Sequence, residues 1–143
     1  MKGKFSAMNI PYVAKTWPIF LYFLLFIFVY ILFLGRKKEE MRIQLLLDFD
    51  SGFYTHATNF VLSFIICMVS GFVEILSSKK TSFTKWIAVF LIFANFIYEW
   101  YIPILNTPDK VDTYYGFVGS VLPFIYFYFF KKWGLKPNPN YST

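Results

Sequence analysis

Four stretches of this chain are too apolar to cover the surface of a water-soluble protein of its size. Their approximate ranges are 16–35, 53–77, 85–105 and 113–131. Between Lys85 and Asp109 the only acidic or basic residue is Glu99. A helix of about 20 mostly apolar residues crosses the hydrocarbon core of a bilayer, and each stretch is close to that length. We therefore predict an all-α integral membrane bundle of four transmembrane helices.

The rest of the chain is short, so the length allows one membrane domain. With 57% hydrophobic residues, the chain has too few polar residues to cover the surface of a soluble globular protein. We assign residues 1–136 to the membrane domain and expect residues 137–143 to be a disordered tail. The connection Glu40–Asp50 is too apolar for a free loop, so we expect a short interfacial helix after the first span.

The net charge of +6 is better explained by membrane topology than by nucleic-acid binding, because the basic residues flank the apolar stretches. On the side of the two termini the bases are Lys2, Lys4, Lys15, Lys79, Lys80, Lys85, Lys131, Lys132 and Lys136. On the opposite side they are Arg36, Lys37, Lys38, Arg42 and Lys110. Lys and Arg collect on the cytoplasmic side, which predicts cytoplasmic termini, although the basic run directly after the first span favours the reverse.

Polar residues recur along the second span at intervals of three and four, which keeps them on one helix face. They are His56, Asn59, Ser63, Cys67, Ser70 and Glu74. This face must look into the bundle, because a polar group without a partner is costly in lipid. Ordinary helix packing explains most of these residues, and we interpret the single cysteine in the same way.

Two acidic residues near the spans differ in their predicted depth. Glu74 lies five residues before Lys79, so it can reach the headgroup level and pair with that lysine. Glu99 follows 13 uncharged residues after Lys85, which places it roughly 20 Å along its helix and past the bilayer midplane. An ionisable group at such depth needs a partner, a proton or a water molecule, and indicates function.

Partners for Glu99 are available on the same side of the membrane, at the start of the second span and in the turn before the fourth. We predict an outward-opening polar pocket whose ligand-binding residues are His56, Asn59, Glu99, Asp109 and Asp112. Two structural explanations remain open: Asp112 could cap the fourth helix, and His56 could be an interfacial or packing histidine. Lys110 would soften the repulsion between its acidic neighbours.

The stretch from Glu99 through Asp112 to Gly119 resembles the third-to-fourth span signature of the VanZ-like proteins, which are small bacterial multi-span membrane proteins. Asp112 matches the Asp that opens their last helix, and Gly119 matches the Gly seven residues later. The match covers roughly residues 50–130. Gly116 stands where Asn is usual, and Ile102 replaces a common Gln.

The resemblance implies a protein of the bacterial cell envelope, in a family named for glycopeptide-antibiotic resistance, with no implied reaction.

Our leading hypothesis is that the pocket binds a polar, cationic headgroup or a cell-wall-related ligand. Alternatives are a structural subunit or homo-oligomeric pore of a membrane complex, and an intramembrane acid/base enzyme in which His56 and Glu99 cooperate. We see no activated nucleophile, metal-ligand spacing or nucleotide-binding loop, so enzymatic activity is less favoured and we expect no cofactor or metal. The expected partners are membrane lipids and a possible homo-oligomer or larger complex, without nucleic acid.

Overall fold

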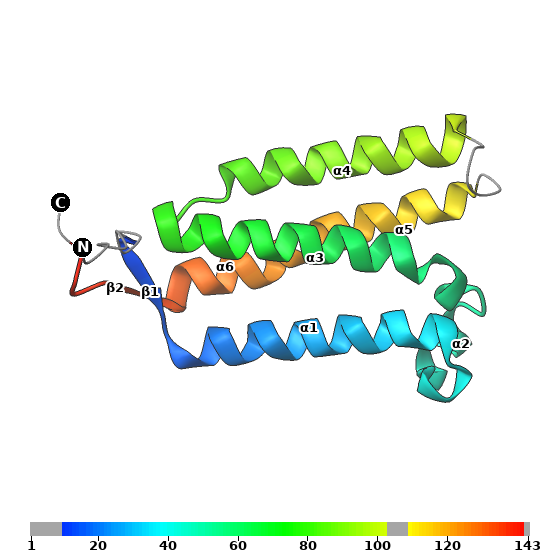
Figure 1. Ribbon diagram of the computed structural model, residues 1–143, viewed down its shortest axis with the longest axis horizontal. Coiled ribbons are helices and arrows are strands. Elements are labelled where there is room, and N and C mark those ends of the chain that lie inside the picture. The colour runs from blue at the N-terminus through cyan, green and yellow to red at the C-terminus, as the bar shows by residue number, and fades with distance from the viewer. Residues whose placement is uncertain (1–9, 103–108, 142–143) are drawn as a thin grey trace, which may run out of the picture.

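The computed structural model describes residues 10–102 and 109–141. Four columns of helix run along the length of the bundle. The columns are α1 (Thr16–Lys37), α3 (Phe53–Ser78), α4 (Ser82–Tyr101), and α5 (Lys110–Val121) followed by α6 (Pro123–Trp133). In the view of Figure 1, α1 and α4 lie on opposite sides of α3. The predicted all-α bundle of four spans is confirmed, with residues 103–105 of the predicted third span outside the described part.

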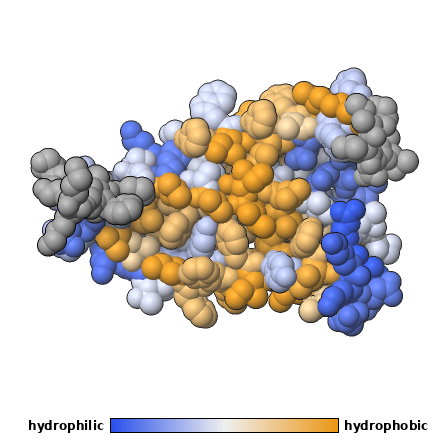
Figure 2. Space-filling view, viewed as in Figure 1, coloured by the Kyte–Doolittle hydropathy of each residue, from blue (hydrophilic) through white to orange (hydrophobic). Residues whose placement is uncertain are grey.

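The outer surface of the bundle is apolar over its middle. Figure 2 shows an orange hydrophobic band across the visible face, with blue residues toward both ends. Large side chains such as Phe20 and Trp86 are 70% and 73% exposed, an arrangement that lipid favours and water opposes. The four columns are each long and apolar enough to cross a bilayer. The chain is a small multi-span membrane protein.

A short helix follows the first span, as predicted from its apolar sequence. The chain forms a 3-10 turn at Glu39–Met41 and then α2 (Gln44–Phe49) before α3 begins. The Ile43 N–H donates to the hydroxyl oxygen of Tyr54 at 2.7 Å, which ties this connection to α3. We call this end of the bundle, which carries α2, the α2 end.

A two-stranded sheet at the opposite end was not predicted. Strands β1 (Tyr12–Ala14) and β2 (Leu135–Pro137) pair antiparallel, with Val13 opposite Lys136. Asn138 extends the pairing, since its N–H donates to the Pro11 carbonyl at 3.0 Å. Residues 137 and 138 of the segment expected to be a disordered tail are therefore hydrogen-bonded to the N-terminal strand. Both strands lie at one end of the bundle, as an even number of spans requires (Figure 1).

The fourth predicted span is two helices rather than one. Pro123 has no N–H, so the Gly119 carbonyl four residues earlier receives no helical hydrogen bond from it. The backbone adjusts locally, with Ile125 N–H donating to the Leu122 carbonyl at 3.1 Å. Together α5 and α6 still form one column across the bundle (Figure 1).

Glu74 connects α3 to the first turn of α4. Its carboxylate accepts hydrogen bonds from the backbone N–H of Phe83 at 2.9 Å and of Thr84 at 2.8 Å. It also accepts from the buried Thr84 hydroxyl at 2.8 Å. A carboxylate there satisfies free N–H groups and the positive end of the helix dipole. The predicted pairing of Glu74 with Lys79 is therefore replaced by capping of the neighbouring helix.

Close contact between α3 and α5 depends on small residues. A Cβ atom added to Gly119 would lie 3.0 Å from the Phe60 Cα, and nearer still to the Phe60 carbonyl oxygen. A Cβ atom added to Gly116 would likewise lie 2.7 Å from the Cγ atom of the Asn95 side chain on α4. Small residues at these positions let the helix backbones approach, as the sequence pattern predicts.

We expect Gly119→Ala to destabilise the bundle by about 1–3 kcal/mol, because the added methyl group would force the two backbones apart. The free energy of unfolding should be measured by denaturing titration in mixed micelles. Val118→Ala on the exposed face of the same helix is the control and should change stability by about 0.5 kcal/mol or less. Equal stability of Gly119→Ala and the wild type would contradict the packing argument.

Candidate functional site

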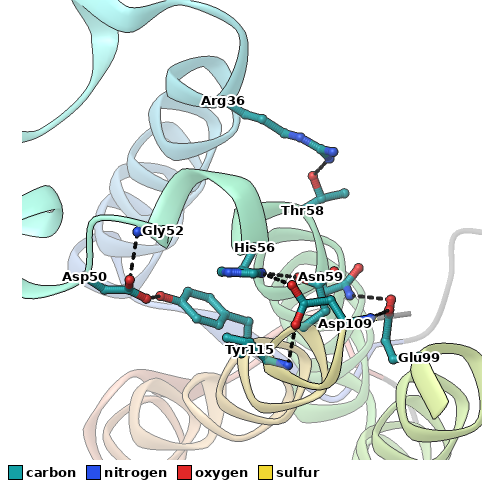
Figure 3. A network of polar contacts seen from close by, with 11 residues as sticks. Arg36, Asp50, Gly52, His56, Thr58, Asn59, Glu99, Asp109 and Tyr115 are labelled. Carbon is teal, nitrogen blue, oxygen red and sulfur yellow. Dashed lines mark hydrogen bonds and ion pairs between the residues drawn. The ribbon is translucent and has the colours of Figure 1, made fainter. Parts of the chain in front are cut away.

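The five predicted site residues meet at the α2 end of the bundle. His56 and Asn59 lie on the first two turns of α3, Glu99 near the end of α4, and Asp109 and Asp112 at the start of α5. Figure 3 shows the side chains of His56, Asn59, Glu99 and Asp109 close together between the helices, and Asp112 bonds His56. We call these five residues the acid network.

His56 joins α3 to the start of α5. Its Nδ1 atom lies 2.9 Å from Asp112 Oδ1 and 3.6 Å from Asp109 Oδ2. Asp109 also accepts a hydrogen bond from the Val111 N–H at 2.9 Å and is the N-cap of α5. The capping role considered for Asp112 therefore belongs to Asp109, which leaves Asp112 to pair with the imidazole.

Glu99 is the most deeply buried member of the network, with 2% of its surface exposed. Its Oε1 atom accepts from the Asn59 amide at 3.1 Å, and its Oε2 atom accepts from the Asp109 N–H at 3.3 Å. Both donors are electrically neutral. The carboxylate is thus solvated by the protein without a cation among these partners.

The acid network has more carboxyl groups than bases. The network has three carboxyl groups and one imidazole, and His56 is the base within ion-pair distance of Asp109 and Asp112 among the described residues. The Lys110 ammonium lies 4.4 Å from the centre of the Trp100 ring, in a cation–π contact. Lys110 therefore reduces the electrostatic repulsion between Asp109 and Asp112 less than its position between them in the sequence suggests.

Sequence reasoning missed Asp50 as part of this region. The Tyr115 hydroxyl donates to Asp50 Oδ2, and the Gly52 N–H donates to Oδ1 at 2.8 Å (Figure 3). The Tyr115 ring also lies 5.3 Å from the His56 ring, which links Asp50 to the network. The Asp50-Ser-Gly52 turn was a local signal, since Asp often bonds the backbone two residues on. Its partner Tyr115, 65 residues away, had no such signal.

The hydrogen bonds from Tyr115, and then from Gly52, hold the pKa of Asp50 below its usual value of 3.8. This carboxyl group is therefore ionised at neutral pH. It lines a cavity of about 310 Å³ together with Phe49, Phe53 and Tyr115. An anionic, aromatic-lined hollow thus borders the acid network on the α2 side.

Further polar contacts along α3 are explained by packing. The Asn95 amide donates to the Ser63 hydroxyl at 3.1 Å, which pairs two polar groups in the middle of the bundle. The Ser70 hydroxyl donates to the Ile66 carbonyl of its own helix at 2.8 Å. Cys67 is buried in the core. The ordinary packing expected for these positions accounts for their contacts.

The network can hold a positive charge or a proton, but it offers limited means for covalent catalysis. The Nδ1 atom of His56 is engaged with carboxyl oxygens, which orients the ring and leaves Nε2 for another partner. Within the described residues, no group of three His, Cys, Asp or Glu side chains is arranged to hold a metal ion. The five members include no hydroxyl or thiol that could act as a nucleophile.

No family model, curated protein or solved structure matches this chain. The VanZ-like resemblance therefore stays a prediction.

We expect Glu99→Ala to destabilise the protein by about 1–3 kcal/mol, because the Asn59 amide and the Asp109 N–H would both lose their acceptor. Glu99→Gln keeps one acceptor oxygen and should cost less. Unfolding in mixed micelles measures both effects, with the exposed Glu40→Ala at the same end as the control. A Glu99→Ala variant as stable as the control would show that these hydrogen bonds do not support the fold.

Tyr115→Phe should weaken the dependence of stability on acid pH. Because the pKa of folded Asp50 is lowered, its stabilising contribution is present above the ordinary Asp pKa of 3.8 and is lost as the pH falls through the folded value. Without the Tyr115 hydroxyl the folded pKa rises toward 3.8, so less stability remains to be lost. Thermal unfolding from about pH 6 to about pH 2.5 measures this loss. The control Tyr114→Phe should behave as the wild type, and an unchanged acid profile in Tyr115→Phe would refute the assignment.

Proposed function

We propose that this protein binds a cationic group at the membrane surface through the acid network. The ligand class is a lipid headgroup, or a cell-wall-related molecule, that carries an amine. The membrane is the bacterial cytoplasmic membrane, with both termini in the cytoplasm and the α2 end outside. In this view the bundle is a scaffold that presents charged side chains at the boundary between lipid and water.

One observation carries the proposal: two carboxyl groups lie within ion-pair distance of a single imidazole, and a third, Glu99, is bonded beside them to Asn59 and to the Asp109 backbone. Glu99, the most buried of the three, accepts hydrogen bonds from neutral donors. An ammonium group bound beside these acids would balance their excess negative charge. Binding is favoured over catalysis because the network contains acceptors for a cation but no nucleophile.

The apolar surroundings strengthen this attraction. Two unit charges 4 Å apart attract by about 1 kcal/mol in water, and by about 4 kcal/mol at the effective dielectric constant of about 20 that suits pairs near a protein surface. Asp109 is the most accessible of the three acids, with 41% of its side chain exposed, while the Asp112 side chain is 12% exposed. A ligand would therefore enter past Asp109 and reach the deeper carboxyl groups.

The VanZ-like resemblance is part of this proposal and adds the bacterial cell envelope as the setting. Two of the positions on which it depends, Glu99 and Asp112, are members of the acid network. A third, Gly119, lies at the close contact between α3 and α5. A role in glycopeptide resistance is a consequence of the resemblance alone.

The test compares dihexanoyl phosphatidylethanolamine with its N-acetylated form, which keeps the phosphate but has no cationic amine. Binding is measured by calorimetry to the whole protein in maltoside detergent. We expect the wild type to bind the free amine more tightly. The double variant Glu99→Gln/Asp112→Asn should lose about tenfold or more of this preference, which corresponds to about 1.4 kcal/mol.

The matched control is Glu40→Gln/Asp48→Asn, which removes two exposed acids from the same end. It should keep the preference for the amine within about threefold, because exposed charges are screened by water and salt. Equal losses in the two double variants would assign the effect to general surface charge. A wild type that does not distinguish the amine from its acetylated form would end the proposal.

A further inference from the structure

A second cavity at the α2 end has the opposite electrostatic character. It has a volume of about 220 Å³ and is lined by Arg36, Arg42, Leu47, Ser51, Tyr54 and Thr55. Arg36 comes from the last turn of α1 and Arg42 from the connection before α2. Of the hydroxyl residues, Ser51 lies in the turn before α3, and Tyr54 and Thr55 lie in its first turn. Two guanidinium groups separated in the sequence thus share one hollow with three hydroxyl groups.

Arg42 is positioned mainly by uncharged groups. The Arg42 Nε–H donates to the Gly35 carbonyl at 3.0 Å, and its guanidinium lies 5.8 Å from the centre of the Tyr54 ring. Its acidic partner is Glu39, whose side chain is 84% exposed, so this ion pair is weak. Arg42 therefore retains most of its capacity to bind an anion.

Arg36 is held at the edge of the cavity by the Thr58 hydroxyl, to which its Nη1 donates (Figure 3). Within residues 10–102 and 109–141, no carboxylate lies within ion-pair distance of Arg36. Its positive charge is therefore not neutralised by the described part of the protein.

The start of α3 adds to the positive potential. This helix runs from Phe53 to Ser78, and Ser51, Tyr54 and Thr55 beside its first turn line the cavity. The N-terminus of a helix carries a partial positive charge and free N–H groups, which favour anions. Gly52 at the N-cap has no side chain to cap this end, but the Phe53 N–H donates to the Asp50 carbonyl at 3.0 Å and the Thr55 N–H to the Gly52 carbonyl at 2.9 Å. The helix end therefore contributes mainly its partial positive charge.

We propose that this cavity is a binding site for a phosphate group. Planar guanidinium groups match the oxygens of phosphate in paired hydrogen bonds, and hydroxyl groups can supply the remaining donors. Since one water occupies about 30 Å³ of liquid volume, the cavity has room for a phosphate group with several waters. Lipid headgroup phosphate and free inorganic phosphate share this chemistry.

The site is separate from the acid network. Its charged groups come from α1 and the connection to α2, whereas the acids come from α4 and α5. Helix α3 contributes to both, with Tyr54 and Thr55 lining the cavity and His56 and Asn59 bonding the acids. The two proposals can therefore fail independently. The amine proposal is tested by variants of Glu99 and Asp112, and the phosphate proposal by variants of Arg36 and Arg42.

The test uses the whole protein in maltoside detergent and three probes. Dihexanoyl phosphatidylglycerol carries the phosphate, dihexanoylglycerol lacks it, and inorganic phosphate lacks the lipid. We expect the wild type to bind phosphatidylglycerol and not dihexanoylglycerol. Arg36→Gln/Arg42→Gln should weaken this binding about tenfold or more. Tighter binding of the lipid than of inorganic phosphate assigns a headgroup, and equal binding assigns a free anion.

The matched control is Lys37→Gln/Lys38→Gln, which removes two exposed positive charges beside Arg36 and should weaken binding about threefold or less. Equal weakening in the two double variants would overturn the proposal in favour of general surface charge. Absence of wild-type binding to both phosphate probes would also overturn it. Should the arginine variant fail to fold, Thr55→Leu keeps both guanidinium groups, fills the cavity from the exposed side of α3 and should also weaken binding. Unchanged binding in Thr55→Leu would place the phosphate elsewhere.

Discussion

The arrangement of this protein depends on one constraint: a polar group inside an apolar bundle must find its partner within the protein. Glu99 meets this constraint through Asn59 on α3 and the Asp109 backbone before α5. These bonds fix the distance and rotation of three helices at the α2 end. Glu74 has the same effect at the other end of the α3–α4 pair, where it caps the first turn of α4. These two carboxylates, one near each end of α4, thus set the position of that helix against its neighbours.

Helix α3 separates opposite charges at the α2 end. Its first two turns bond the acids of α4 and α5 on one side and border the arginines of α1 and its connection on the other. Direct pairing would neutralise both groups, and exposed ion pairs contribute little stability. Because the helix keeps them apart, each group remains available to a ligand of opposite charge. Gly119 of α5 lets that helix approach the α3 backbone at Phe60, on the side of α3 where Asp112 meets His56.

Much of the fold followed from length and hydropathy, because the bilayer fixes how long an apolar helix must be. The meeting of His56, Asn59, Glu99, Asp109 and Asp112 was also predictable, since helical spacing and predicted depth placed them on one side of the membrane. The pairings within the group were not. Asp109 rather than Asp112 caps α5, and Lys110 lies over Trp100, because rotation about a helix axis and the path of a turn decide such contacts. The β1–β2 pair and the Asp50–Tyr115 bond join residues too distant in sequence for any local pattern to reveal.

The apolar connection after the first span has a role that hydropathy alone did not indicate. Its backbone is fixed to Tyr54, and its residues Arg42 and Leu47 close the side of a polar cavity. Farther along, Phe49 and Asp50 line the adjoining aromatic hollow. A segment of about ten residues therefore places the cationic Arg42 in the wall of one cavity and the anionic Asp50 in the wall of the other. A short helix that rests its apolar side chains on lipid is suited to presenting these charged groups, because its polar side then faces the headgroups.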